Sequence, residues 1–504
     1  MTNNPHKISV PDRPGDVAVA EDRDTSYAAG ASVEATAAGT SLLSSTPGLH
    51  LVRRFSFGPT PQLVGWTRIV GATRWFHQQL RPGRIPDPLA DHVWRSFPLA
   101  GMDTRQIAAE TDAGTTTAQV QYYTATLGRQ LWSTRQVLEV MVDFWGNLLN
   151  VPMPNPSLWH LAGPYHNEVI RRHALGRFRD MLHAAMRHPA MLRYLSNDVS
   201  KKSSVNENLG RELLELHTVG INGGYTETDV RNSAYILTGR TIDGDGLFRY
   251  DPARHYTGAV KVLGFSDANA TAEGGLAVGD RYLAYLATHP ATARFIARKL
   301  AVRFVADSPP KSLVDRLAKA YLDNDTAIGP VLRALVGSEE FAGAVGAKTR
   351  RPLENTTATA RALGVWPDGD TMTQGLTGLM SHLTQVGHRP HGWQGPDGYP
   401  DVAAAWNSAG TMLKQWNLHR RLTDNALAGL RHLGADRLVL FVPRGVDDYL
   451  DALSDRLVFQ ALTPAHRAGL RAYLGPDVTT GAQAHEHAAA LAALILDSAY
   501  FALR

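Results

Sequence analysis

Apolar residues recur at intervals of three and four positions along most of the chain, which is the spacing of helices with one buried face. The segments 291–307 and 312–324 show this period clearly. One segment departs from it: in GLFRYDPARHYTGAVKVLGF, residues 246–265, aromatic and β-branched residues alternate around a turn. The pattern predicts a mainly α-helical, large multi-helical globular fold with one small β-hairpin insert.

The beginning of the chain has the composition of a disordered segment. Residues 1–46 are rich in Ala, Gly, Ser, Thr and Asp and offer few large apolar side chains to a core. We expect a disordered N-terminal tail at 1–46 and a helical core domain at 47–430 that contains the polar site. A C-terminal helical extension at 431–504 is expected to pack on that core.

A helix predicted at about 115–150 is expected to lie at the centre of the core. Its C-terminal part, LEVMVDFWGNLLN, is apolar almost all round, as in helices that are buried on every side. Asp143 and Asn147 stand four residues apart within it and therefore share one face. A buried carboxylate needs a partner, so this face is expected to meet other polar residues.

The stretch SVNENLGRELLELHTVGINGGYTETDV, residues 204–230, combines an apolar stripe with an unusual polar surface. A solvated helix usually carries mixed Lys–Glu pairs, but this one carries asparagines, carboxylates, one arginine and one histidine. The stripe consists of Leu209, Leu213, Leu214 and Leu216, and the polar set is Asn206, Glu207, Asn208, Arg211, Glu212, Glu215 and His217. We interpret this helix as facing an interior polar site. The alternative is a salt-bridged structural helix.

Three charged residues of this helix are spaced by four positions. Glu207, Arg211 and Glu215 can therefore pair as Glu–Arg–Glu along one face, with Glu212 beside them. Two adjacent carboxylates in a partly closed site cannot both stay ionised without a cation, so one pKa rises. Arg211 can hold one of them ionised and leave another protonated, which separates a base from an acid.

The roles expected within this helix follow from those neighbours. Glu215 is the first candidate for the proton-transferring group, because it lies beside both Glu212 and Arg211. Glu207 is expected to fix Arg211, and His217 could carry a proton near the helix end. Removing Arg211 is expected to strand buried carboxylates at a cost of about 3–5 kcal/mol.

Composition excludes several classes of partner and chemistry. The net charge is +4 on 51 basic and 47 acidic residues, which is too balanced to indicate a nucleic-acid partner. The chain has no cysteine, so thiol nucleophiles, disulfides and cysteine-ligated metals are absent. No apolar run is long enough to span a membrane, and the first residues lack the pattern of a secretion signal. We therefore expect a cytoplasmic protein.

The motif search excludes the common catalytic signatures. The chain contains no phosphate-binding P-loop, no G-x-S-x-G serine elbow and no H-E-x-x-H zinc motif. Nucleotide, serine-hydrolase and zinc-protease chemistry are therefore unsupported, and no cofactor is predicted.

A long loop at 387–407, GHRPHGWQGPDGYPDVAAAWN, is dense in Gly, Pro, His and Trp. Loops of this length inside a helical protein are often functional. His388 and Trp393 could line the mouth of a pocket and contact an aromatic or extended substrate. The alternative is a loop braced by its own aromatic residues.

Several segments together resemble the large bacterial family catalogued as domain of unknown function 1800. The matching segments cover about residues 49–418 in the family's order, and NENLGRELLELHT is the most specific of them. The others are HLVRRFSFGPTP, VMVDFWGNLLNV, VIRRHALGRFRDML, ILTGRTID, HPATARFIARKLAVRFVADSPP and the loop at 387–407. The family name records no general activity, so the resemblance implies no reaction.

Two positions depart from the family pattern. Relatives often read F-W-x-N-H at the end of the central helix, where this chain has Leu148. Relatives also often have His-Asp in the hairpin, where this chain has His255 and Tyr256. If those positions hold a metal or an acid–base pair in relatives, this protein has lost part of it and its pocket is more apolar.

These observations favour a cytoplasmic enzyme that acts on an organic small molecule, of the kind found in specialised metabolism, by acid–base chemistry without a nucleotide cofactor. Cyclisation, isomerisation, dehydration and hydrolysis all fit. The candidate catalytic residues are Glu215, Glu212, Glu207, Arg211 and His217, and the candidate substrate-binding residues are Asp143, Asn147, Asn208, His255, His388 and Trp393.

Two alternatives stay open. The first is a metal-dependent oxidoreductase or hydrolase, in which His217 and His255 would help to bind a divalent metal. The second is a non-catalytic binding or scaffold protein, in which the Glu–Arg–Glu set would be wholly buried and paired.

Overall fold

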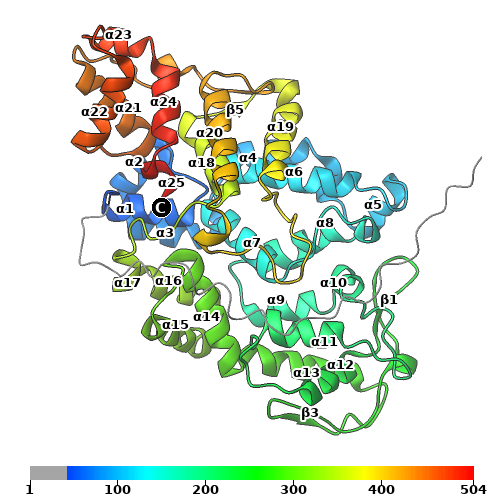
Figure 1. Ribbon diagram of the computed structural model, residues 1–504. Helices are drawn as coiled ribbons and strands as arrows, with labels where there is room; N and C mark the ends of the chain where they lie inside the picture. Colours follow the sequence, from blue (N-terminus) through cyan, green and yellow to red (C-terminus); the bar gives the residue numbers. More distant parts are fainter. Residues whose placement is uncertain (1–41) are drawn as a thin grey trace, which may run out of the picture. The chain divides into compact units, whose positions relative to one another are not determined.

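Capping residues define the beginnings of several helices in the computed structural model, which describes residues 42–504. The side chain of Thr60 accepts a hydrogen bond from Leu63 N–H at the start of α2 (Pro61–Val70). Thr226 and Asp229 form a capping box at the start of α12 (Glu227–Leu237). Both are typical helix starts, and the mainly α-helical fold predicted from the sequence is confirmed (Figure 1).

Among the helices before the hairpins, α6 and α7 pack on each other and on several of their neighbours, including α3, α4 and α8. In chain order the helices before the hairpins are α1 (Pro47–Phe55), α2, α3 (Ala72–Gln79), η1 (Pro82–Arg84), α4 (Pro88–Arg95), η2 (Pro98–Gly101), α5 (Thr104–Glu110), α6 (Thr117–Trp132), α7 (Gln136–Leu148), η3 (Pro156–Leu158), α8 (Ala162–Tyr165), η4 (His166–Arg171), α9 (Phe178–Ala185), α10 (Pro189–Tyr194), α11 (Asn208–Glu212), η5 (Leu213–His217) and α12. The segments η4 and η5 are π-helical.

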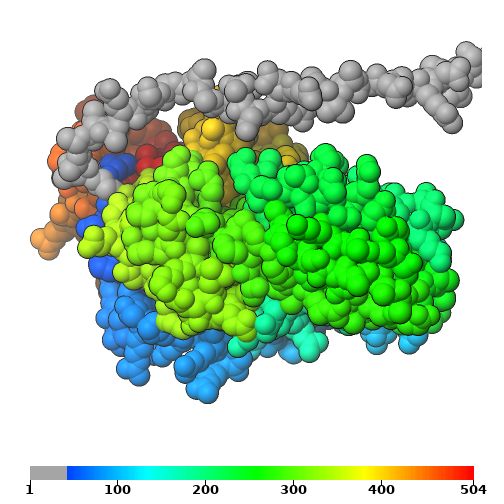
Figure 2. Space-filling model, turned by 90° about the horizontal axis from the view of Figure 1, so that it is seen from below, coloured from blue at the N-terminus to red at the C-terminus, as the bar shows by residue number. Residues whose placement is uncertain are grey.

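The second half of the chain continues in helices around the same core. They are α13 (Gly275–Thr288), α14 (Pro290–Phe304), α15 (Lys311–Asp323), α16 (Ile328–Val336), α17 (Glu339–Ala342), α18 (Pro352–Leu363), η7 (Gly369–Thr371), α19 (Met372–Gln385), η8 (Ala403–Ala405), α20 (Ala409–Thr423), η9 (Ala435–Arg437), α21 (Val446–Val458), α22 (Pro464–Leu474), α23 (Gly481–His485), α24 (Ala488–Leu496) and α25 (Ala499–Ala502). Figure 2 shows that the green middle segment forms most of the face seen from below.

The expected disordered tail falls largely on residues 1–41, which lie outside the described residues. Its last residues are already packed, because Leu43 is buried in the core and Gln460 bonds the backbone at both neighbours, Leu42 and Ser44. Residues 41–504 form one compact unit. Within it the C-terminal helices pack on α18 and α20.

The single long helix predicted at 115–150 is wrong, because the chain breaks between α6 and α7. Ser133 has an extended backbone there, and its hydroxyl donates to the carboxylate of Asp87 at 2.6 Å. The Thr134 N–H donates to the same carboxylate at 2.8 Å. Asp87 thus satisfies groups that a continuous helix would have bonded internally, from a distant position that periodicity cannot reveal.

The predicted single hairpin is two hairpins. β1 (Arg240–Ile242) pairs with β2 (Phe248–Tyr250), and β3 (Val260–Val262) pairs with β4 (Phe265–Asp267), both antiparallel. The two strand segments foreseen at 246–265 therefore pair outward with their neighbours, separated by the short helix η6 (Pro252–Arg254). A third two-stranded sheet joins β5 (Trp366–Pro367) to β6 (Leu430–Arg431).

One face of α7 carries a polar residue at every fourth position. Glu139, at its N-terminal end, forms a two-bond ion pair with Arg171, with oxygen–nitrogen distances of 2.9 and 2.6 Å. Burial raises the pKa of Glu139, but the guanidinium of Arg171 outweighs it and holds that pKa below its usual value. Asp143 and Asn147 follow on the same face and bind different parts of the chain.

Asp143 belongs to a buried set of three arginines and three carboxylates, which we call the central ion cluster. Its members are Asp143, Arg303, Arg351, Glu354, Asp401 and Arg504. Arg303 reaches Asp143 at 3.0 Å, Glu354 at 2.5 Å and Asp401 at 3.1 Å. The cluster joins α7, α14, the start of α18, the loop at 387–407 and the C-terminal residue.

The buried arginines and carboxylates of the central ion cluster keep one another charged. Glu354 is 4 % exposed and Arg303 is 1 % exposed, so neither charge is stabilised by water. Burial raises the pKa of Glu354, but the guanidiniums of Arg303, Arg504 and Arg351 together hold it well below its usual value. Removing one partner would leave an uncompensated buried charge.

Within residues 42–504, no helix is both long enough and apolar enough to cross a bilayer.

The central ion cluster generates a stability prediction. Glu354→Gln keeps the shape of the side chain but leaves three guanidiniums facing two carboxylates, so the free energy of unfolding should fall by about 3–5 kcal/mol. Chemical denaturation measures this. Glu110→Gln is the control, because Glu110 is exposed. A loss no larger than that of the control would contradict a structural role for the cluster.

Candidate functional site

The stretch 204–230 forms a short α-helix, α11, that continues as the π-helical segment η5. Leu209, Leu213 and Leu214 are buried, so the predicted apolar stripe is largely confirmed. Gly210 lets α11 approach α12 closely, because a Cβ there would lie 2.7 Å from Ala234 N. π-Helical turns are frequent at functional sites, because the extra residue re-aims the side chains around it.

Arg211 pairs with three carboxylates rather than two. It lies 3.7 Å from Glu207 and 3.3 Å from Glu215, so the predicted Glu–Arg–Glu pairing is confirmed. Its shortest contacts, at 2.8 and 2.6 Å, go to Glu227 at the start of α12. Glu227 was not among the residues singled out from the sequence.

The Arg211 set is partly open to solvent. The side chain of Arg211 is 32 % exposed and that of Glu227 is 73 % exposed. The expected folding cost of 3–5 kcal/mol for losing Arg211 is therefore too large. Exposed pairs contribute about 0–1 kcal/mol each.

Glu212 adjoins this set on the same helix, and its surroundings raise its pKa. Burial raises its pKa, the carboxylates of Glu215 and Asp397 raise it further, and Arg211 only partly opposes them, so that it reaches about 6. Asp397 comes from the loop at 387–407. The helix and the loop that the sequence singled out separately therefore meet at Glu212.

Tyr194, from α10, completes this meeting point. Its hydroxyl donates to the Gln394 carbonyl in the loop at 2.6 Å. Burial, Glu212 and Asp397 together raise the pKa of Tyr194 to about 12, so it remains a neutral hydrogen-bond donor. The Trp393 indole N–H donates to Asp397 at 2.7 Å and fixes the position of that carboxylate.

Lys299 on α14 is the cation of this region. It keeps contact with solvent, but the surrounding protein lowers its pKa by desolvation, against the opposing effect of Asp401 and Asp397. Within the described residues it forms no ion pair with a carboxylate closer than 4.0 Å, and its ammonium lies 5.5 Å from the ring of Phe295. Its ammonium is therefore free to bind a ligand.

His217 is a buried neutral histidine. Its Nδ1 donates to the Leu148 carbonyl at 3.1 Å, which fixes the tautomer with an unprotonated Nε2. That Nε2 is buried without a hydrogen-bond partner in the described part of the chain. Burial and, to a smaller extent, the charge of Lys299 lower the pKa of His217 to about 4, although the hydrogen bond to Leu148 opposes them.

His255 does not join this site. It is fully buried, its Nδ1 lies 2.8 Å from the Thr238 carbonyl, and its Nε2 lies 2.8 Å from Asn269 Oδ1. Both ring nitrogens are therefore used in bracing the hairpin region. Residues 42–504 contain no group of three or more His, Asp or Glu side chains arranged to hold a metal ion.

Asp143 and Asn147, two of the candidate substrate-binding residues, do meet other polar groups, but these belong to parts of the chain other than 206–217. Asp143 binds Arg303 and Arg351 in the central ion cluster. Asn147 bonds both backbone groups of Tyr399, donating to its carbonyl at 2.7 Å and accepting from its N–H at 2.5 Å. These two residues hold the loop at 387–407 in place instead of extending the Glu212 site.

The remaining predicted binding residues have separate surroundings. His388 is buried, accepts a hydrogen bond from Leu353 N–H at 3.3 Å and stacks on Trp406 with ring centroids 4.5 Å apart. Burial holds its pKa well below the usual value, so it is a neutral brace of the loop. Asn208 is exposed at the start of α11, and Trp393 lies in the Glu212 site.

One family of known proteins matches almost all of the described part of the chain. Residues 50–503 match the family described as "Protein of unknown function (DUF1800)". The chain belongs to the DUF1800 family. No curated protein and no solved structure matches it, so the roles of residues in this DUF1800 protein rest on their geometry.

Sequence reasoning missed four residues of the DUF1800 site: Glu227, Tyr194, Lys299 and Asp397. Asp397 lies in the loop that was expected to be functional, but the candidate residues chosen from that loop were a histidine and a tryptophan, His388 and Trp393. Tyr194 and Lys299 are ordinary helix residues by their spacing. The folded chain brings Tyr194 near Glu212 and Asp397, and it brings Lys299 near Asp397 and Asp401.

The raised pKa of Glu212 predicts a pH-dependent stability. Unfolding returns this pKa to 4.5, so between pH 4.5 and about 6 the folded state binds more protons and loses stability as the pH rises. Glu212→Gln removes that loss. The free energy of unfolding of the variant minus that of wild type should therefore be larger at about pH 7.5 than at about pH 4, as measured by urea unfolding at the two pH values.

Glu110→Gln is again the matched control, and its stability difference from wild type should be the same at both pH values. If the Glu212→Gln difference were equally flat, Glu212 would have an ordinary pKa in the folded protein.

Proposed function

We propose that this protein is a cytoplasmic acid–base enzyme that acts on an organic small molecule, and that Glu212 is its proton-transferring group. The supporting observation is the pKa of Glu212, which is raised to about 6 by burial and by two neighbouring carboxylates. A general acid or base works best when its pKa lies near the working pH. Perturbed groups of this kind cluster at functional sites.

The Arg211 set places a cation next to Glu212 on the same helix. Arg211 lies 3.3 Å from Glu215, and its charge partly opposes the effect of the neighbouring carboxylates on the pKa of Glu212. Glu215 was the first candidate from the sequence, because it has Glu212 as an acidic neighbour and Arg211 as a cation. The raised pKa of Glu212, to which Asp397 contributes, favours Glu212 for that role instead.

The other groups of the site would bind and orient the substrate. Tyr194 offers a neutral hydroxyl, Trp393 an aromatic surface and Lys299 a cation without a close carboxylate. Proton-driven cyclisation, isomerisation, dehydration and hydrolysis use such a set. The partial exposure of Arg211 supports an accessible site over a wholly buried brace.

Metal-dependent chemistry is the second candidate. Its support is the unprotonated His217 Nε2, which is buried without a partner among residues 42–504 and has the chemistry of a metal ligand. Elemental analysis of the purified protein separates the two proposals. Stoichiometric iron, copper, zinc or manganese would favour a metal-dependent oxidoreductase or hydrolase.

Turnover by the wild type and the Glu212→Gln variant tests the acid–base proposal. Each purified protein is incubated with a small-molecule extract, and chromatography with mass detection follows every compound, including isomers of unchanged mass. Wild type should convert a compound that Glu212→Gln converts about a hundredfold more slowly or less, because the amide keeps the shape but cannot transfer the proton.

Glu110→Gln provides the matched control, because it is the same glutamate-to-glutamine change at an exposed position on α5, outside the Glu212 site. It should retain turnover. If Glu212→Gln converted the same compound at the wild-type rate, the assignment to Glu212 would be wrong.

A further inference from the structure

A large pocket lies on a different part of the molecule from the Glu212 site. It has a volume of about 1930 Å³ and is bounded by α2, α3, the α6–α7 turn, α16 and the turn between α18 and β5. It shares no lining residue with the Glu212 site. Pockets for drug-sized ligands are usually about 300–1,000 Å³, so this one has room for a longer molecule.

The charged residues that line this pocket are all cationic. Six arginines line it and no aspartate or glutamate does. Two of them are engaged elsewhere: Arg361 donates to the carbonyls of Gly58 and Leu131, and Arg177 pairs with Asp325. The other four, Arg74, Arg81, Arg84 and Arg333, have no carboxylate within 4.0 Å in the described part of the chain.

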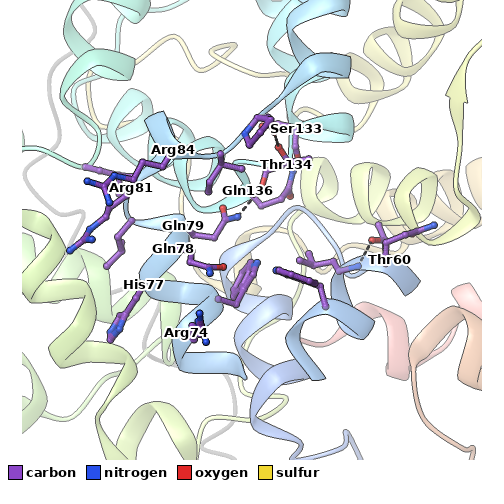
Figure 3. A pocket seen from close by; sticks show the side chains of 18 of the residues that line it. Thr60, Arg74, His77, Gln78, Gln79, Arg81, Arg84, Ser133, Thr134 and Gln136 are labelled. Carbon is purple, nitrogen blue, oxygen red and sulfur yellow. Dashed lines mark hydrogen bonds between the residues drawn. The ribbon is translucent and has the colours of Figure 1, made fainter. Parts of the chain in front are cut away.

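Three of these four arginines lie close together in the sequence, on α3 and the turn that follows it. Arg74 lies on α3, and Arg81 and Arg84 lie on the turn that follows it. Figure 3 shows Arg81 and Arg84 together at one side of the pocket, Thr60 at the opposite side, and Gln78 and Gln79 between them. Guanidiniums bind carboxylate, sulfonate and phosphate groups through paired hydrogen bonds, so this side suits an anionic group.

Large aromatic surfaces supply the apolar part of the pocket. Trp66 is 48 % exposed and Trp366 is 39 % exposed, although both line a concave surface. The indole N–H of Trp132 donates to the Val365 carbonyl at 2.8 Å, which places that ring beside the turn that carries Trp366. Contiguous exposed apolar side chains of this kind mark binding surfaces.

We propose that this pocket binds a soluble organic anion with an extended apolar body. The anionic group lies against the Arg81 and Arg84 side, and the apolar body lies against Trp66, Trp132 and Trp366. The positive charge of the arginines that line the pocket favours an anionic ligand. The exposed tryptophan rings offer a contact surface for a planar or long apolar body. The inference is independent of the acid–base proposal, because no residue is shared.

Two fluorescent probes of the same shape test this proposal on the full chain. Pyrenebutyrate carries a carboxylate and pyrenebutanol is its neutral analogue, and fluorescence anisotropy measures the binding of each. Pyrenebutyrate should bind saturably at one site and about tenfold or more tighter than pyrenebutanol, because it alone pairs with arginines.

Three variants locate the site. Arg81→Gln with Arg84→Gln should weaken pyrenebutyrate by about tenfold or more and leave pyrenebutanol unchanged. Trp66→Ala should weaken both probes. Arg437→Gln with Arg444→Gln removes the same charge from exposed positions outside the pocket and should change neither.

Equal affinity for the two probes would overturn the proposal, as would equal effects of the two double-arginine variants. A third arm uses vesicles that contain phosphatidylglycerol in a sedimentation assay. Binding to vesicles that depends on Arg81 and Arg84, without saturable binding of pyrenebutyrate, would assign the surface to a membrane and overturn the soluble ligand.

Discussion

The arrangement of this protein depends on the pairing of three buried arginines with three buried carboxylates. Arg303, Arg351 and Arg504 meet Asp143, Glu354 and Asp401 with distances of 2.5 to 3.3 Å. Buried charges are tolerated only where each is compensated, so the elements that carry them are held in one relative position. Those elements include the central helix and the loop at 387–407.

The same pairing places the candidate site. Arg303 and Lys299 are one helical turn apart on α14, and Asp401 and Asp397 are four residues apart in the loop. Arg303 binds Asp401 within the cluster, while Lys299 and Asp397 face the site where Asp397 raises the pKa of Glu212. The Arg303–Asp401 ion pair and the charged groups Lys299 and Asp397 thus belong to the same two segments.

The sequence predicted what local interactions determine. The helical fold and the pairing of Arg211 with Glu207 and Glu215 both depend on residues a few positions apart. The break between α6 and α7 depends on Asp87, and the partners of Asp143 lie 160 and 208 positions away. Periodicity carries no information on such pairs, so the choice between Glu212 and Glu215 required the position of Asp397.

The structure shows what contacts the two positions, Leu148 and Tyr256, at which this chain departs from the DUF1800 pattern. The Leu148 carbonyl accepts the Nδ1 proton of His217, so the backbone at this position fixes the tautomer of a site histidine. Tyr256 stacks on Tyr235 with ring centroids 4.0 Å apart, beside a histidine whose two nitrogens are both bonded. Neither departure removes a side chain that the Glu212 site uses.

The most direct test of this account is the titration of the Glu212 carboxyl group itself. Protein labelled with carbon-13 at the glutamate carboxyls would be followed by NMR across the acidic range, with the Glu212 signal assigned by its absence in Glu212→Gln. The account predicts a midpoint near 6 that falls when Asp397 is replaced by Asn. A midpoint near the ordinary value of 4.5, unchanged by that replacement, would contradict it.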